Sequence, residues 1–168
     1  LLQVLGSLDD TRLIFTLPNA DTGGREMIRM LEEFVVRHEN ARAYPSLGQL
    51  RYLSCIAHVD GVVGNSSSGL LEAPTLKTGT VNIGDRQKGR PCAASVINCD
   101  PSVEAISGAI ARLYSKEFKN SLVLTQNPYG EGGATEKIAN ILRQADLTGL
   151  SMKRFYNLSH CRPETKSD

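Results

Sequence analysis

The chain has 168 residues, a formal net charge of +1 and 40% hydrophobic residues. This length suits one domain with a sizeable core, and the balanced charge excludes a bulk attraction for nucleic acid or for an acidic membrane surface. No apolar run approaches the roughly 20 residues that cross a bilayer, and no segment has the character of a signal peptide. The four cysteines lack the spacing of a metal site. We therefore expect a cytoplasmic protein with reduced thiols and with neither a metal nor another cofactor.

Short β-rich runs alternate with segments of helical periodicity along most of the chain. Strands are expected at residues 12–17, 41–44, 59–63, 81–83 and 95–99. Helices are expected after Gly23-Gly24, from Ser46, from Ser66–Ser68, from Asp100 and after Gly132-Gly133. This alternation predicts an α/β fold, a Rossmann-like domain in which helices cover both faces of a parallel sheet. Ligands of such domains bind at the carboxyl edge of the sheet.

Three helix starts carry capping signals. The candidates are Asp21 or Thr22, Ser46 with Gln49 as a capping box, and Asp100 followed by Pro101 at the first helical position. The helix that starts at Ser46 should turn Leu50, Leu53 and Ala57 toward the core.

The most informative segment follows the strand expected at 59–63. It reads Gly-Asn-Ser-Ser-Ser-Gly from Gly64 to Gly69. A Gly/Ser turn that leads into a helix presents free N–H groups, the positive end of the helix dipole and small hydroxyls to one spot. We expect Ser66 and Ser67 to bind a phosphate there, with the two glycines letting it approach the backbone. An ordinary helix-capping turn is the alternative.

The next strand is followed by Gly-Asp-Arg-Gln-Lys-Gly-Arg, which contains Arg86 and Arg90. Arginines neutralise phosphate with a forked donor geometry that lysine lacks. Arg86 equally suits a structural role in the turn. Glu72 can face the same pocket, but a phosphate would repel its carboxylate, so it should reach toward ribose hydroxyls. Together these segments predict a nucleoside-diphosphate pocket.

Two loops that follow the first two strands supply further candidates. Asn19 or Asp21, just past the first strand, could contact the nucleotide, and backbone groups of Ser46, Leu47 and Gly48 could form the base site. Asn, Asp, Ser and Gly are also common turn residues, so plain turn chemistry remains open at both loops.

Three motifs occur in order along the chain: LPNADTGG, NSSSG-x-x-E and VNIGDRQ-x-GR. In type and spacing they resemble the C-terminal half of the hydrolysing UDP-N-acetylglucosamine 2-epimerases of sialic-acid-type pathways, over roughly Leu13 to Leu142. The resemblance implies a glycosyltransferase-B-like parent with two Rossmann-like domains, of which this chain would be the C-terminal, UDP-binding one. It also implies diphosphate binding for Arg90 and ribose binding for Glu72.

The reaction implied by this resemblance is an elimination. UDP leaves C1 of the sugar, a proton leaves C2, and water adds to give N-acetylmannosamine or a relative. The family's acid and base groups would lie in the N-terminal domain and in a histidine before the first strand. No histidine precedes Arg12, so we assign no catalytic residue here.

The expected organisation is a nucleotide-binding domain at 1–146 and a tail at 147–168. The chain starts at Leu1 without a methionine, and the enzymes resembled are longer, so we expect a missing N-terminal domain. We expect the polar end of the tail, Arg162–Asp168, to be disordered. The apolar residues of the tail should dock on that domain or on another copy, which favours a homo-oligomer. UDP or a UDP-sugar is the expected ligand.

Two other functions fit the same residues. One is the donor-binding half of a glycosyltransferase, which shares the architecture. The other is a non-catalytic UDP-sugar-binding module. The first alternative is disfavoured by the NSSSG and GDRQ-x-GR motifs.

Overall fold

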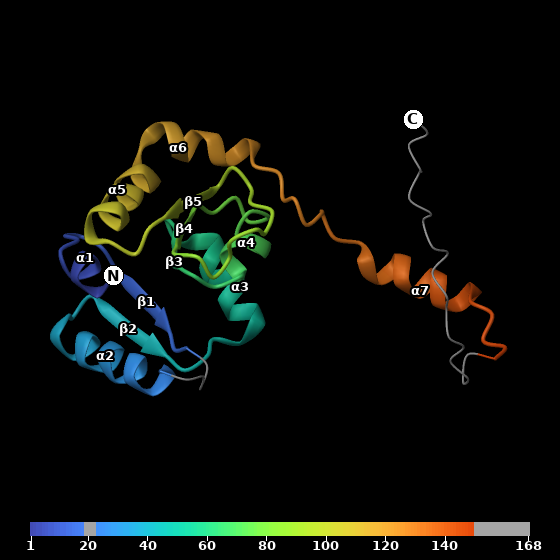
Figure 1. The fold of residues 1–168 in the computed structure, drawn as a ribbon, viewed down its shortest axis with the longest axis horizontal. Helices are drawn as coiled ribbons and strands as arrows, with labels where there is room; N and C mark the ends of the chain where they lie inside the picture. Colours follow the sequence, from blue (N-terminus) through green and yellow to red (C-terminus); the bar gives the residue numbers. More distant parts are fainter. Residues whose placement is uncertain (19–22, 150–168) are drawn as a thin grey trace, which may run out of the picture. The chain divides into compact units, whose positions relative to one another are not determined.

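The computed structural model describes residues 1–18 and 23–149, which belong to two compact units, Leu1–Glu131 and Gly132–Asp168. Figure 1 labels the elements along the chain. The strands are β1 (Leu13–Thr16), β2 (Ala41–Tyr44), β3 (Val62–Gly64), β4 (Thr80–Ile83) and β5 (Val96–Cys99). The helices are α1 (Leu2–Gly6), α2 (Gly24–Arg37), α3 (Gly48–His58), α4 (Ser68–Leu71), α5 (Val103–Tyr114), α6 (Lys116–Ser121), a 3-10 turn at Leu122–Leu124, and α7 (Ala134–Gln144).

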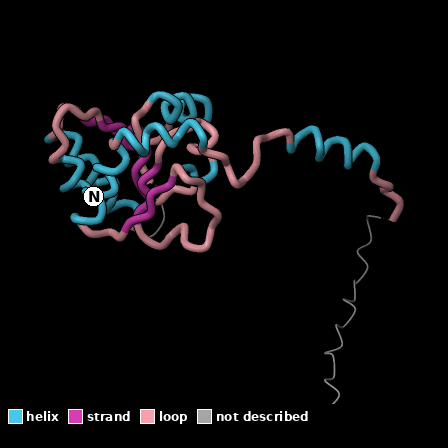
Figure 2. Tube along the Cα trace, turned by 90° about the horizontal axis from the view of Figure 1, so that it is seen from above, coloured by secondary structure: helices cyan, strands magenta, loops and turns pink. Residues whose placement is uncertain are grey.

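All five strands pair in parallel, which confirms the predicted α/β class. β1 pairs with β2, and β4 lies between β3 and β5. We expected one sheet, but among the described residues no ladder joins the two-stranded and three-stranded sheets. β1 alternates between half-buried and exposed positions, so one of its faces lacks the cover that a central strand has. Figure 2 shows the strands of the first unit enclosed by helices and loops.

The core of the first unit is centred on β4. Val81 is fully buried, as expected for the middle strand of a three-stranded parallel sheet. α5 packs against β4 and β5 and buries Ile106, Ala109, Ile110 and Leu113, which recur at helical spacing. On the smaller sheet α2 packs against β2, as Figure 1 shows.

α4 lies against β4 at a position where residue 69 is glycine. A Cβ at Gly69 would come within 2.5 Å of the Thr80 methyl carbon. The Thr80 hydroxyl donates a hydrogen bond of 3.0 Å to the Gly69 carbonyl oxygen. The close approach therefore fixes the start of α4, and the loop before it, on the central strand.

All three predicted N-caps are wrong. α2 has Gly23 at its N-cap, rather than Asp21 or Thr22. α5 is capped by Ser102, whose hydroxyl accepts from the Ala105 N–H at 3.1 Å, rather than by Asp100. A serine with extended backbone can point its oxygen at the N–H three residues later. α3 has Leu47 at its N-cap, because Ser46 instead accepts from the Gly48 N–H at 3.1 Å.

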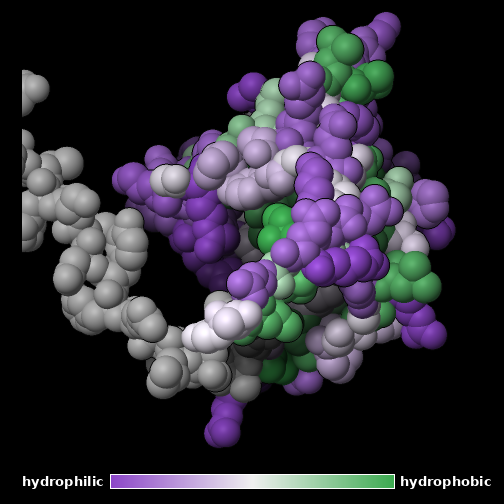
Figure 3. Space-filling view, turned by 90° about the vertical axis from the view of Figure 1, so that its right-hand side faces the viewer, coloured by the Kyte–Doolittle hydropathy of each residue, from purple (hydrophilic) through white to green (hydrophobic). Residues whose placement is uncertain are grey.

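Several apolar helix residues are more exposed than expected. On α3 the buried residue is Ile56, whereas Leu50 is 80% exposed and Ala57 is also exposed. The predicted helix after Gly133 is confirmed as α7, but its apolar face, with Ile141 at 68% exposed, is uncovered by described residues. Figure 3 shows hydrophobic areas among hydrophilic ones on one face of the molecule.

The connection from β4 to β5 contains no helix. Parallel strands are normally joined by a crossover with a helix, but here residues 84–95 form only turns, bends and extended chain. This crossover contains the GDRQKGR segment, so its charged residues lie on a loop at the carboxyl end of β4.

Candidate functional site at the carboxyl ends of β3 and β4

The loop between β3 and α4 has a backbone suited to binding an anion. Gly64 ends β3 with φ +151°, a conformation that residues with a side chain rarely adopt. The Ser66 oxygen accepts from the Ser68 N–H at 3.4 Å, which leaves the Ser66 hydroxyl hydrogen free to donate. Among described residues the N–H groups of Ser66 and Ser67 have no recorded acceptor. Two amides and a hydroxyl are therefore available to a ligand.

The helix that follows this loop is too short for its dipole to contribute much to anion binding. α4 spans four residues, and a single turn sums few peptide dipoles. The backbone amides and hydroxyls must therefore carry most of any anion affinity. Gly69, which we expected to let phosphate approach, is buried against Thr80 and serves packing instead.

Glu72 is tied to the same helix turn. The Ser68 hydroxyl donates to a Glu72 carboxylate oxygen, and Glu72 itself is exposed. The Ser68 hydroxyl therefore already donates to Glu72, whereas the hydroxyls of Ser66 and Ser67 have no recorded acceptor among described residues. The carboxylate keeps acceptor capacity for a hydroxyl-rich group.

The loop after β4 is bound directly to the loop after β3. Arg86 donates from its guanidinium to the Asn65 carbonyl oxygen at 3.1 Å, and Gln87 donates its amide to the same oxygen at 2.7 Å. β3 and β4 are neighbours in register, with Gly64 opposite Asn82. The strand register and these two hydrogen bonds bring the predicted serine and arginine segments together.

Arg90 lies on the same loop and is exposed. Its backbone N–H donates to the Gln87 carbonyl oxygen at 3.2 Å, which closes a turn beneath the side chain. In the described part of the chain its guanidinium has no recorded ion pair. Segment 84–90 holds three cationic side chains against the single carboxylate of Asp85. The loop therefore offers net positive charge beside the free amides of Ser66 and Ser67.

The other predicted site residues are placed differently. Asn19 and Asp21 lie outside the described residues. The base-site candidates Ser46, Leu47 and Gly48 follow β2, on the two-stranded sheet, and the Gly48 N–H is already engaged by Ser46. Whether these five residues contact a nucleotide stays a prediction.

Sequence reasoning missed Asn65 and Gln87. Gln87 is 4% exposed, and its side-chain oxygen is buried without a recorded partner among described residues. A glutamine between an arginine and a lysine in a turn looks like a solvated residue from sequence alone.

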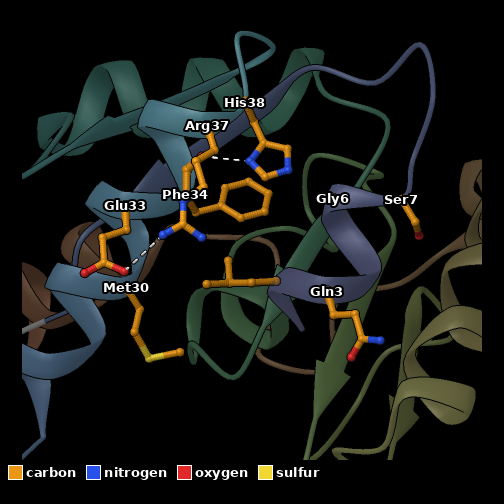
Figure 4. Close-up of a pocket in the computed structure, with 9 residues that line it drawn as sticks. Gln3, Gly6, Ser7, Met30, Glu33, Phe34, Arg37 and His38 are labelled. Atoms are coloured by element: carbon orange, nitrogen blue, oxygen red, sulfur yellow. Dashed lines mark hydrogen bonds and ion pairs between the residues drawn. The ribbon is translucent and has the colours of Figure 1, made fainter.

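A cavity lies elsewhere in the first unit, between α1 and α2, and Figure 4 shows residues that line it. Its volume is about 450 Å³. His38 stacks on Phe34 with ring centroids 3.8 Å apart, and its Nδ1 donates to the Phe34 carbonyl oxygen at 2.8 Å. The cavity contains none of the predicted site residues.

Two absences concern only residues 1–18 and 23–149. No group of three or more His, Cys, Asp or Glu side chains there could hold a metal ion. No helix of the described segments is both long and apolar enough to cross a membrane.

Comparisons with known proteins identify the family. The family model for UDP-N-acetylglucosamine 2-epimerase matches residues 1–143. The chain is 37% identical over 160 residues to the GDP/UDP-N,N'-diacetylbacillosamine 2-epimerase (hydrolyzing) of Campylobacter jejuni, covering 94% of this chain and 41% of that protein. It is 32% identical to UDP-N,N'-diacetylbacillosamine 2-epimerase (hydrolyzing) of Legionella pneumophila, covering 81% of this chain and 35% of that protein.

A solved structure supports the fold. The UDP-GlcNAc 2-epimerase of Neisseria meningitidis, bound to UDP-GlcNAc, superposes with a TM-score of 0.63 at 17% identity. The match covers 86% of this chain and 39% of that one, which confirms the glycosyltransferase-B-like α/β fold class. The chain spans about two-fifths of the length of the curated relatives it matches. From the extent of the family match, this chain belongs to the UDP-N-acetylglucosamine 2-epimerase family.

Proposed function

We propose that this chain is the UDP-binding domain of a hydrolysing UDP-N-acetylglucosamine 2-epimerase, and that it is catalytically incomplete on its own. The observation that carries the proposal is the joined pair of loops after β3 and β4. Free amides of Ser66 and Ser67 lie on one loop, Arg90 on the other, and Asn65 links them. A diphosphate needs both kinds of donor in one place.

Each residue has a separate task in this proposal. Ser66 and Ser67 bind one phosphate through backbone and hydroxyl donors, and Arg90 binds the other. Arg86 divides its guanidinium between the Asn65 carbonyl and the diphosphate. Glu72 accepts from ribose hydroxyls, which keeps its carboxylate away from the phosphates. The Asn19 loop and the segment Ser46–Gly48 contact the cleft side of the nucleotide and the base.

The proposed reaction of the parent enzyme breaks the C1–O bond of the sugar and releases UDP. A base removes the C2 proton, and its electron pair forms the C1=C2 double bond. Water then adds across that bond, hydroxyl to C1 and a proton to C2, which yields N-acetylmannosamine or a related 2-acetamido sugar. This domain stabilises the negative charge that develops on the leaving diphosphate. The acid and base groups belong to a domain outside this chain.

The first test is nucleotide binding by the 168-residue chain. Calorimetry should detect weak binding of UDP and weaker binding of uridine, because half a cleft leaves one face of the ligand in water. GDP is the comparison nucleotide, since the name of the Campylobacter relative includes both GDP and UDP. The chain alone should release no UDP from UDP-N-acetylglucosamine. Turnover by the chain would refute the proposed incompleteness.

The second test separates the enzyme from its alternatives. A full-length parent given UDP-N-acetylglucosamine without any acceptor should form UDP and free N-acetylmannosamine. A glycosyltransferase would require an acceptor, and a non-catalytic binding module would return the sugar nucleotide unchanged. Either result would replace the epimerase proposal.

A further inference from the structure

The segment 125–130 reads Thr-Gln-Asn-Pro-Tyr-Gly and follows the last helical turn of the first unit. We call it the strap. The strap is distant in sequence from the candidate site. Its side chains nevertheless form hydrogen bonds with the segment that contains α4 and with Pro91, which follows the arginine loop.

One end of the strap is fixed to the segment that contains α4. The Asn127 amide donates to the Leu71 carbonyl oxygen at 2.8 Å and to the Thr75 hydroxyl at 2.7 Å. The Lys77 ammonium donates to the carbonyl oxygen of Thr125, whose side chain is 2% exposed. α4 begins directly after Ser66 and Ser67, so these bonds restrain the helix that the serine loop enters.

The other end is fixed to the arginine loop. The Tyr129 hydroxyl donates to the Pro91 carbonyl oxygen at 3.1 Å, and Pro91 directly follows Arg90. The Asn127 side-chain oxygen also accepts from the Tyr129 N–H at 3.0 Å. One asparagine side chain therefore couples the α4 contacts to the tyrosine that holds the arginine loop.

We propose that the strap holds the serine loop and the arginine loop at the separation that a diphosphate requires, with Asn127 and Tyr129 as positioning residues. This inference rests on the proposed function. Neither residue needs to touch the ligand in this role. Each hydrogen bond fixes a loop before binding, so the ligand does not have to order it. The strap should therefore matter for a diphosphate and not for a nucleoside.

The variants for the test are Tyr129→Phe and Asn127→Ala in the 168-residue chain. Tyr129→Phe removes only a hydroxyl. Its control is Tyr114→Phe, because Tyr114 and Tyr129 are each 42% exposed and no hydrogen bond of the Tyr114 hydroxyl is recorded among described residues. Asn120→Ala, on the exposed surface of α6, is the control for Asn127→Ala.

Titrations with UDP and with uridine provide the first measurement. Tyr129→Phe should raise the Kd for UDP by about three- to ten-fold, as expected for one lost neutral hydrogen bond. Asn127→Ala removes three hydrogen bonds and should raise this Kd at least as much. The Kd for uridine and both control variants should stay unchanged. Amide hydrogen exchange without ligand gives a second measurement: the hydrogen-bonded amides of Ser68, Leu70 and Arg90 should exchange faster in the strap variants than in the controls.

The outcomes distinguish the two proposals. If the unmodified chain does not bind UDP, the proposed function fails and this inference fails with it. If the unmodified chain binds UDP but Tyr129→Phe binds it equally well, only the role of the strap is overturned. Equal losses for UDP and uridine would also overturn it, because they indicate general destabilisation rather than positioning.

Discussion

Gln87 donates a hydrogen bond of 2.7 Å to the carbonyl oxygen of Asn65, and this bond joins the loops that follow two neighbouring parallel strands. Gln87 is 4% exposed and its other amide atom, the oxygen, is buried without a recorded partner among described residues. Because the Gln87 amide is a buried donor, a negative charge in its place should destabilise the contact between the two loops. A glutamate at position 87 has nearly the same shape and can measure this effect.

Gln87→Glu should destabilise the fold in a pH-dependent way. The new carboxylate would be buried against the Asn65 carbonyl oxygen, so its folded pKa should lie above its unfolded value. The penalty should be absent below the unfolded pKa, grow as pH rises and reach about 2 to 4 kcal/mol above the folded pKa. Urea titrations at several pH values measure it. The control Gln49→Glu, exposed in the first turn of α3, should show no such loss. A pH-independent difference for Gln87→Glu would contradict the burial.

Arg90→Ala should weaken UDP binding by about 1.5 to 3 kcal/mol, because a charge-assisted hydrogen bond to phosphate is lost. Uridine binding should not change, since uridine carries no phosphate. Calorimetry with both ligands measures the difference, and Arg25→Ala on the exposed side of α2 is the control. Equal losses for the two ligands would place Arg90 in a structural role.

Gly69→Ala should destabilise the first unit by about 1 to 3 kcal/mol, since the added methyl group must displace Thr80 or shift α4. Gly108→Ala provides a matched control, because it lies within α5 and its Cβ would meet no atom within 4 Å. That substitution should stabilise by about 0.5 to 1 kcal/mol through helix propensity. Thermal and urea unfolding report both changes. If the two substitutions changed the free energy of unfolding in the same direction, α4 would not be confined against β4.

Cys99 should react with iodoacetamide more slowly than the exposed Cys92. Burial, and secondly the negative charge of Asp100, raise the pKa of the Cys99 thiol, so less thiolate is present at a given pH. Asp100→Asn removes the smaller cause and should speed the reaction modestly. Peptide mass spectrometry at pH 8 follows each cysteine. In denaturant the two cysteines should react alike, and a difference that persists there would rule out burial as the cause.

Removal of residues 147–168 should raise solubility and leave UDP affinity unchanged. Leu147 is 69% exposed, and the sequence after it contains further large apolar residues, which favour association in water. Sedimentation velocity and UDP titration measure the two properties. Removal of residues 132–168, the whole second unit, tests the boundary independently. Loss of UDP binding on removal of residues 147–168 would show that the nucleotide-binding domain extends further than we predict, whereas unchanged binding without residues 132–168 would show that it ends earlier, near Glu131.

The strands and the main site loops could be predicted from sequence because their signals are local. Val81 lies in a β-branched run bounded by Gly79 and Gly84, and the structure places it in the central strand. The serine and arginine segments each follow a strand. In a parallel sheet that position alone brings them to one edge.

The contacts that join the two loops could not be predicted in the same way. Asn65 binds Gln87 through a backbone oxygen, and every residue type has that oxygen. The Asn127 contacts with Leu71 and Thr75 connect residues more than 50 positions apart. The wrong N-cap at Asp100 has a simpler cause: Ser102 competes as a capping residue two positions later, and tertiary packing of α5 decides between them.

The crossover between β4 and β5, which contains no helix, has two roles. Residues 84–95 both return the backbone to the start of β5 and carry the cationic side chains. In most α/β units a helix returns the chain to the next strand, and the loop before that helix can vary without affecting the connection. Here a substitution that displaces the cationic side chains also disturbs the connection to β5, an edge strand of the sheet. Ligand affinity and sheet stability should therefore vary together across a mutational scan of this crossover, and separately in the loop between β3 and α4.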